Sequence, residues 1–355
     1  MTSEKSDDIM NILREKYAAA ARKAHRGAIL QPGAMGDCIL TLPLAAFMKE
    51  SLGLGGLDLI GHMDYISILS GRSCIDGVRS IESLDLHRLF RRAGDFDLAD
   101  ADPLITAFCD YSWIASFMGA AGGDFEQNLI FTANCSHSAE VVTIDAGPAA
   151  DGPERMSAWL IRQFVQQCGM SIEMPETGCG AGLIKATPAD CRRGQQLLAE
   201  LGVASAGRVA IIHPGSGGRE KCWHPDNYLS VASELAQQGF EVLFVLGPAE
   251  VARFGEAQIS RIAAAAACLR EAPLADVLAT LSGASVFVGN DSGPAHLAAG
   301  LGVPTVVLFG PTDPAVYAPA GPSVAIIRDR GPDFAHKADP GVQRQVVETA
   351  LKTAS

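Results

Sequence analysis

The sequence predicts an α/β chain built from two doubly wound, Rossmann-like domains. Short apolar segments alternate with longer segments of helical period along most of its 355 residues. Such alternation is typical of parallel strands joined by helices that cover both faces of a sheet. The length suits two domains that each bury their own core. Both halves also begin alike, with a strand and then a glycine turn, at residues 31–37 (QPGAMGD) and 213–218 (HPGSGG).

The first domain is expected over residues 1–185, with an amphipathic helix at 8–24 before its first strand. Its other elements follow the apolar pattern. The expected strands are 28–31, 57–61, 78–83, 111–117 and 140–144, and the expected helices are 38–51, 86–92, 103–110 and 154–168. Pro43 conflicts mildly with the helix 38–51, because proline is best tolerated in a first turn. Residues 169–187 are rich in glycine and proline, lack a clear period and are expected to form a linker.

The second domain is expected over residues 186–355 and repeats the alternation. Its expected strands are 208–213, 242–246, 286–289, 305–309 and 324–327, and its expected helices are 188–201, 225–238, 249–269, 274–282, 295–300 and 341–352. Two packing positions remain open for the last helix: against this domain or back onto the first. Domains of this kind bind ligands outside the carboxyl ends of their strands.

Composition excludes several functional classes. Asp and Glu number 40 against 28 Lys and Arg, a net charge of -12, which argues against a general nucleic-acid or anionic-membrane binder. None of the nine cysteines is spaced as CxxC, so a zinc site or disulfide framework is not expected. The N-terminus lacks an apolar signal core, and no apolar run reaches about 18 residues. We therefore expect a cytoplasmic protein without an integral membrane segment.

The stretch 286–314 carries the strongest functional signal. A buried strand is followed by a polar turn at 290–294, a helix of small residues and a second strand. A helix N-terminus at the carboxyl end of a strand attracts anions. Asp291, Ser292 and Gly293 are therefore candidate ligand-binding residues, as is Thr312 in the turn after the second strand. A structural role is compatible with this, in which Asp291 or Ser292 caps the helix.

The glycine turn at 213–218 is the second candidate. Gly215 and Ser216 allow a close backbone approach to phosphate oxygens, and Lys221 adds a point charge. The alternative is a surface turn with a solvated lysine. Neither GxGxxG nor a P-loop sequence occurs here, so an NAD-dependent enzyme or a nucleoside triphosphatase is disfavoured.

Asp37 ends the first glycine turn and begins a helix. It is either an N-cap or a carboxylate placed to accept a proton from an attacking hydroxyl. Two DxD patterns at 95–102 suggest a metal–diphosphate site, but a solvated acidic loop is favoured because no apolar strand precedes them. Arg88, Arg91 and Arg92 form a basic face that is solvated or contacts an anionic acceptor. The histidines at 62, 87 and 137 lack companions at metal-ligand spacing, so surface or core positions are expected.

Three segments in order resemble the bacterial heptosyltransferases, glycosyltransferase family 9. They are PGAMGDCILTLPLAAFMK at 32–49, HPGSGGREKCWHPDNY at 213–228 and GNDSGPAHLAAGLGVPTVVLFGPTDP at 289–314. The resemblance implies the GT-B fold, in which two Rossmann-like domains face each other across the active-site cleft. It implies transfer of a heptose from ADP-L-glycero-D-manno-heptose to the lipopolysaccharide inner core, with inversion and without a metal.

The resemblance also implies roles for single residues. Asp37 becomes the general base, Lys221 and the Ser292–Gly293 turn become diphosphate ligands, and Asp291 contacts the donor sugar. Glu250 matches the glutamate that binds the ribose, while Gly36, Arg88 and Arg92 are candidates on the acceptor side. The implied partners are a nucleotide-sugar donor and a glycolipid acceptor at the inner membrane face.

Two departures from the family pattern bear on the acceptor. The turn QPGAMGD differs from the usual KTSSMGD or PSWVGD, and Tyr317 stands where a tryptophan usually follows GPTDP. Two alternatives therefore remain: a relative that glycosylates a protein or small molecule, and a nucleotide-sugar-binding protein without catalysis.

Overall fold

The computed structural model describes residues 25–147, 154–169, 182–203, 207–329, 331 and 333–354. The expected helix at 8–24 and most of the expected linker, 170–181, lie outside these ranges. Two compact units emerge from the contacts, and each is described by itself. Among the described residues, unit 1 comprises 25–33, 41–147 and 157–169, and unit 2 comprises 34–40, 154–156 and those from 182 onward.

Unit 1 contains a parallel five-stranded sheet of order β3-β2-β1-β4-β5. Its strands are β1 (Arg26–Gln31), β2 (Gly56–Gly61), β3 (Gly77–Ser80), β4 (Tyr111–Ser116) and β5 (Glu140–Thr143). Its α-helices are α3 (Leu42–Ser51), α4 (Met63–Ile66), α5 (Pro103–Phe108), α6 (Asp124–Ala133) and α7 (Met156–Cys168), the first residue of α7 being grouped with unit 2. Short 3-10 turns are η1 (Ile81–Ser83), η2 (Leu86–Phe90) and η3 (Ala93–Asp95). The expected helix at 86–92 is thus a 3-10 turn, and α4 and α6 were not expected.

The expected helix 38–51 is in fact two helices, α2 (Met35–Leu40) and α3, with Thr41 between them. Pro43 lies in the first turn of α3. No intrahelical hydrogen bond is lost there, because the first N–H groups of a helix have no partner within it. The break also lets α2 pack against α12 (Gly293–Gly300), which groups α2 with unit 2.

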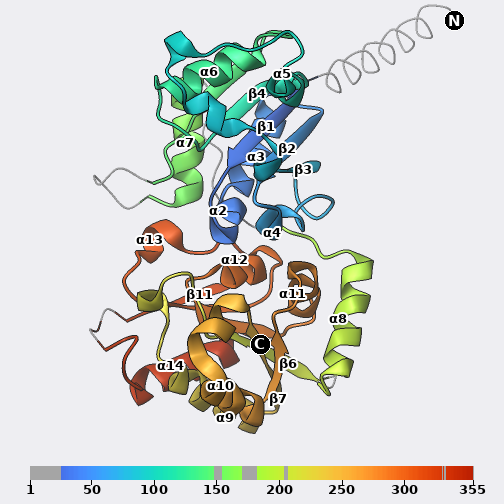
Figure 1. The fold of residues 1–355 in the computed structure, drawn as a ribbon. Coiled ribbons are helices and arrows are strands. Elements are labelled where there is room, and N and C mark those ends of the chain that lie inside the picture. The colour runs from blue at the N-terminus through green and yellow to red at the C-terminus, as the bar shows by residue number, and fades with distance from the viewer. Residues whose placement is uncertain are drawn as a thin grey trace, which may run out of the picture. The chain divides into compact units, whose positions relative to one another are not determined.

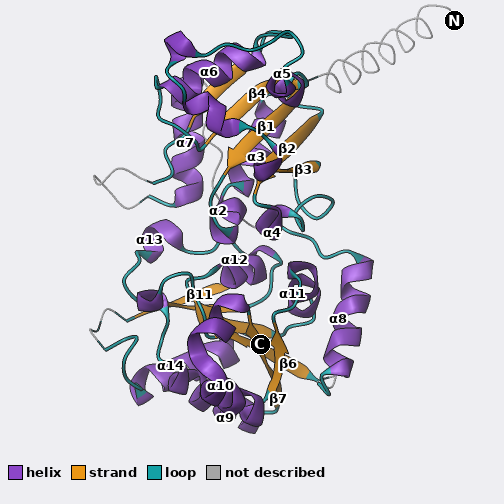
Figure 2. Cartoon of the chain, viewed as in Figure 1, coloured by secondary structure: helices purple, strands orange, loops and turns teal. Residues whose placement is uncertain are grey.

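Unit 2 contains a second parallel sheet (Figure 2). It has six strands in the order β11-β10-β9-β6-β7-β8. Its strands are β6 (Arg208–His213), β7 (Phe240–Leu246), β8 (Ala267–Arg270), β9 (Val286–Asn290), β10 (Thr305–Phe309) and β11 (Val324–Arg328). Its remaining helices are α8 (Pro188–Glu200), η4 (Arg219–Lys221), α9 (Pro225–Gln237), α10 (Pro248–Ala265), α11 (Leu274–Leu281), α13 (Pro314–Tyr317) and α14 (Pro340–Thr353).

Helices cover both faces of this sheet, so the predicted doubly wound α/β architecture is confirmed. Helices α9, α10 and α14 gather on one face, and α8, α11 and α12 on the other (Figure 1). The final helix, whose packing the sequence left open, contacts α9 and strands β9 to β11 of unit 2. No helix among the described residues is both long and apolar enough to cross a membrane.

One element of unit 2 was predicted wrongly. The expected helix 249–269 ends at Ala265, and residues 267–270 form the edge strand β8. The alanine run favours a helix locally, but pairing with β7 draws the next residues into the sheet. Helix α10 is also kinked at Gly255, whose φ of 68° suits glycine.

The strand order of unit 2 reverses between β6 and β9. Along the chain, β6 leads outward to β7 and β8, whereas β9 leads the other way to β10 and β11. Connections on the two sides diverge at such a point and leave room for a ligand at the carboxyl edge. The loops after β6 and β9 therefore meet where a ligand is expected.

Candidate functional site

Asn290 joins the loops that follow β6 and β9. Its side chain is fully buried and makes four hydrogen bonds. Oδ1 accepts from Trp223 N at 2.9 Å and from the Tyr228 hydroxyl at 2.7 Å. Nδ2 donates to Pro214 O at 2.9 Å and Gly215 O at 3.2 Å. These bonds fix the glycine turn against the end of β9, because an amide buried without partners is costly.

Asp291 is the meeting point of three loops. The Thr312 hydroxyl donates to its Oδ2 at 2.8 Å, and Lys221 Nζ lies 3.4 Å from the same oxygen. Ser216 Oγ donates to the backbone oxygen of Asp291 at 2.6 Å. The structure thus brings together four residues that the sequence singled out separately.

The pKa of the Asp291 carboxyl lies below its ordinary value. Burial alone raises this pKa, but the neighbouring His296 ring, the Thr312 hydroxyl and the charge of Lys221 outweigh that effect. His296 Nε2 lies 3.7 Å from Asp291 Oδ1. The carboxylate is therefore charged at neutral pH, and Lys221 and His296 face it from different elements.

The N-terminus of α12 carries two buried polar atoms without partners among the described residues. Ser292 occupies the N-cap position, but its hydroxyl makes no capping bond, and His296 Nδ1 is likewise unpaired. The predicted capping role of Asp291 or Ser292 is therefore wrong, because the Asp291 side chain bonds to Thr312 instead. Residues four apart share a helix face. Two orphaned polar groups beside the positive helix end are suited to an anion.

Gly215 is the residue of the glycine turn that packs most closely against Glu250 of α10. A Cβ atom there would lie 1.9 Å from Glu250 Oε1. Glu250 is buried, and its Oε2 accepts from the Gly247 backbone N at 2.9 Å, which caps α10. Arg253, one turn later, donates to Ser216 O at 3.1 Å and Gly217 O at 3.4 Å. The first two turns of α10 therefore pack against the glycine turn and hydrogen-bond to it.

Helix α2 carries Asp37 and packs against α12. A Cβ atom on Gly36 would lie 3.2 Å from His296 Cδ2, so the helices approach closely at this glycine. Asp37 is the third residue of α2, and its exposed carboxylate accepts from Ala34 N at 3.0 Å. The predicted N-cap position is thus wrong, since Asp37 reaches back from the third helical position to the residue before the helix.

The remaining candidates lie in unit 1. Arg88 forms a two-pronged ion pair with Asp102, with nitrogen–oxygen distances of 2.9 and 2.6 Å. This pair raises the pKa of Arg88 and lowers that of Asp102, which also caps α5 through Leu104 N. Arg92 remains exposed beside η3.

The acidic DxD loop at 95–102 and the histidines were considered above as possible metal ligands. No group of three His, Cys, Asp or Glu side chains suited to a metal occurs within the described ranges. His62 pairs with Glu82, whose pKa falls to about 2 through hydrogen bonds from Ser80 and His62.

Several site residues were not predicted: Asn290, Tyr228, His296 and Arg253. Asn290 was detectable in principle, as a polar residue that ends a wholly apolar strand. Tyr228, His296 and Arg253 carry no local signal, because their partners lie on loops distant in sequence.

Comparisons with known proteins point to one family. Residues 166–340 match the model of "Glycosyltransferase family 9 (heptosyltransferase)". The chain is 24% identical over 301 residues to lipopolysaccharide heptosyltransferase 3 of Escherichia coli, covering 80% of this chain and 83% of that protein.

Solved structures support the same fold. A glycosyl transferase family 9 protein from Veillonella parvula superposes with a TM-score of 0.69 at 15% identity, covering 94% of this chain and 97% of that one. E. coli heptosyltransferase WaaC, solved with ADP, superposes with a TM-score of 0.61 at 18% identity, covering 92% and 100%. The chain therefore has the GT-B fold, and its residues 166–340 belong to glycosyltransferase family 9, the heptosyltransferase family.

Proposed function

We propose that this glycosyltransferase moves a heptose from ADP-L-glycero-D-manno-heptose to a lipopolysaccharide inner-core acceptor, with inversion and without a required metal. The observation that carries the proposal is the convergence of Lys221, Asp291 and Thr312 beside the unpaired Ser292 hydroxyl at the N-terminus of α12. The named activity of the E. coli relative and the ADP in the WaaC structure support the choice of donor.

The diphosphate of the donor is assigned to the N-terminus of α12. The Ser292 hydroxyl and the first backbone N–H groups, including that of Gly293, supply donors there. Lys221 is one-third exposed and only 3.4 Å from Asp291, so its ammonium can reach a neighbouring phosphate without leaving the site. Gly215 and Ser216 bring backbone close to the ligand, Glu250 takes the ribose, and Asp291 with Thr312 takes the sugar.

In the proposed transfer step these residues divide the work between them. Asp37 removes the proton from an acceptor hydroxyl, and that oxygen attacks the anomeric carbon from the face opposite the diphosphate. The bond between the anomeric carbon and the diphosphate oxygen breaks, and ADP leaves with the electron pair. The growing negative charge is met by the α12 N-terminus and Lys221, which are fixed before reaction. Attack opposite the leaving group inverts the anomeric centre.

A second acceptor class has one specific observation in its favour. Asp102 neutralises Arg88, so only part of the basic face at 88–92 is available to an anionic glycolipid. This favours a family relative that glycosylates an uncharged acceptor, on a protein or a small molecule. For the glycolipid acceptor, we propose that the enzyme works peripherally at the inner membrane face, with Arg92 and Gly36 on the acceptor side.

The test is release of ADP from ADP-heptose in the presence of a lipopolysaccharide inner-core acceptor. Asp37→Asn should lower the transfer rate by about 10²-fold or more while ADP affinity stays unchanged, since a general base acts in the chemical step. Asp110→Asn, an exposed carboxylate beside β4, is the matched control. Full activity in Asp37→Asn would remove the base assignment, and loss of activity in EDTA would contradict metal independence.

A further inference from the structure

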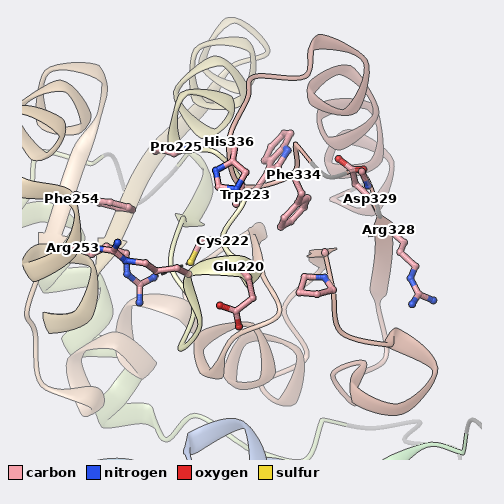
Figure 3. Close-up of a pocket in the computed structure, with 15 residues that line it drawn as sticks. Glu220, Cys222, Trp223, Pro225, Arg253, Phe254, Arg328, Asp329, Phe334 and His336 are labelled. Atoms are coloured by element: carbon pink, nitrogen blue, oxygen red, sulfur yellow. Dashed lines mark hydrogen bonds between the residues drawn. The ribbon is translucent and has the colours of Figure 1, made fainter.

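A pocket of about 1040 Å³ lies in unit 2, apart from the α12 N-terminus. Its walls come from η4 and the start of α9, from the second turn of α10, and from the loops that follow β10 and β11 (Figure 3). A volume of this size is at the upper end of the range for small-molecule sites.

Aromatic rings form much of the pocket lining. Trp223 and Phe334 are 1% and 5% exposed, and Phe254 lies on the opposite side (Figure 3). The Phe334 ring packs on the turn after β10, where a Cβ atom on Gly310 would lie 2.7 Å from it. Trp223 Nε1 has no hydrogen-bond partner within the described part of the chain. Phe254, which is half-buried, and the small exposed parts of the other two rings give the pocket an apolar wall for an aromatic ligand.

Arginine side chains lie beside these rings. Arg219 and Arg253 line the pocket together with two acidic residues, Glu220 and Asp329, whereas Arg328 is paired with Asp313 at 3.1 Å. The bonds described for Arg253 go to uncharged groups: two backbone carbonyls and the Cys222 sulfur, 3.0 Å away. A guanidinium held by neutral acceptors keeps its attraction for an anion.

The pocket is separate from the diphosphate site although the two share a wall. Glu220 and Cys222 line the pocket, whereas Lys221 between them contacts Asp291. Asp291, Ser292 and Glu250 do not line it. We propose that this pocket binds a small aromatic anion, a planar ring bearing a phosphate, sulfonate or carboxylate, at the same time as the donor occupies its own site. Binding of the aromatic anion does not depend on the proposed function, but its simultaneous occupancy with the donor rests on the proposed donor site.

The test is a fluorescence titration of the full chain with 8-anilinonaphthalene-1-sulfonate, an aromatic anion. The parent should bind it saturably, and saturating ADP should leave its affinity unchanged. Arg219→Gln should weaken it about threefold by removing one partly screened charge. Ala335→Trp should weaken it about tenfold or more by filling the pocket, which Ala335 lines.

Arg261→Gln is the control, because Arg261 lies on α10 outside this pocket and bonds to Gln258 and Asp226. Thermal melts check that each variant is folded, and Arg219→Gln keeps the test valid if Ala335→Trp fails to fold. Absence of saturable probe binding to the parent would overturn the proposal. So would equal probe affinity in Arg219→Gln, folded Ala335→Trp and the control Arg261→Gln. Displacement of the probe by ADP would overturn it as well.

Discussion

Replacing Gly215 with alanine tests whether the close contact between the glycine turn and α10 shapes the donor site. The new Cβ would lie 1.9 Å from Glu250 Oε1, 2.1 Å from its Cδ and 2.5 Å from its Cγ, far inside van der Waals contact. Because three atoms of the side chain are met, rotation of its tip alone does not relieve the clash. Glu250 must leave its buried position and give up the 2.9 Å bond to Gly247 N.

The expected cost has two parts. Losing a helix cap costs about 1 kcal/mol, and overpacking costs about 1–3 kcal/mol. At about 2–4 °C per kcal/mol for a domain of this size, the Tm should fall by about 4–16 °C. ADP affinity should fall about tenfold or more, or about 1.4 kcal/mol, since the proposed ribose ligand is displaced.

Gly217→Ala is the matched control in the same turn. A Cβ atom at Gly217 meets nothing within 4 Å, so its effect on stability should stay within about 0.5 kcal/mol. Differential scanning fluorimetry and calorimetric titration with ADP measure both quantities. If Gly215→Ala melts and binds ADP as Gly217→Ala does, the close packing of Glu250 on the turn is refuted.

Two further predictions concern the buried polar groups. Asn290→Ala should lower the free energy of unfolding by about 3 kcal/mol or more, because it removes four bonds and leaves the buried Tyr228 hydroxyl unpaired; a loss under about 1 kcal/mol in urea melts would contradict this. Asp291→Asn should change the pH dependence of stability. The lowered pKa of Asp291 stabilises the fold above the unfolded value of about 3.9, and this is lost as pH falls through the folded pKa. The Tm of Asp291→Asn should therefore lie furthest below that of the parent at pH 7, and the gap should shrink below about pH 4. A Tm difference that stays constant with pH would contradict the lowered pKa of Asp291.

Much of the fold was predictable because its central strands are buried on both faces. Strands β6 and β10 match the apolar runs 208–213 and 305–309 residue for residue, since parallel strands covered by helices read as continuous apolar segments. Strand β8 was missed because an edge strand after an alanine run has no such signal. The break at Thr41 was missed too, although Pro43 marked the place.

The donor side of the site was predictable from topology. The carboxyl ends of parallel strands share one edge, so the turns after β6, β9 and β10 had to meet. The packing of α2 against α12 could not be predicted from the sequence, because it depends on the fit of Gly36 against His296, far later in the chain. The ion pair between Arg88 and Asp102 could not be predicted either, because Asp102 was interpreted as part of a solvated acidic loop.

Calorimetric titration of ADP, UDP and GDP into the parent and Lys221→Ala tests the central claim, an ADP-sugar site at the α12 N-terminus. Lys337→Ala is the control, since Lys337 is exposed and pairs with Asp333. The account predicts that the parent prefers ADP and that Lys221→Ala weakens it about tenfold or more, while Lys337→Ala does not. Preference for UDP or GDP, or equal ADP affinity in all three proteins, would contradict it.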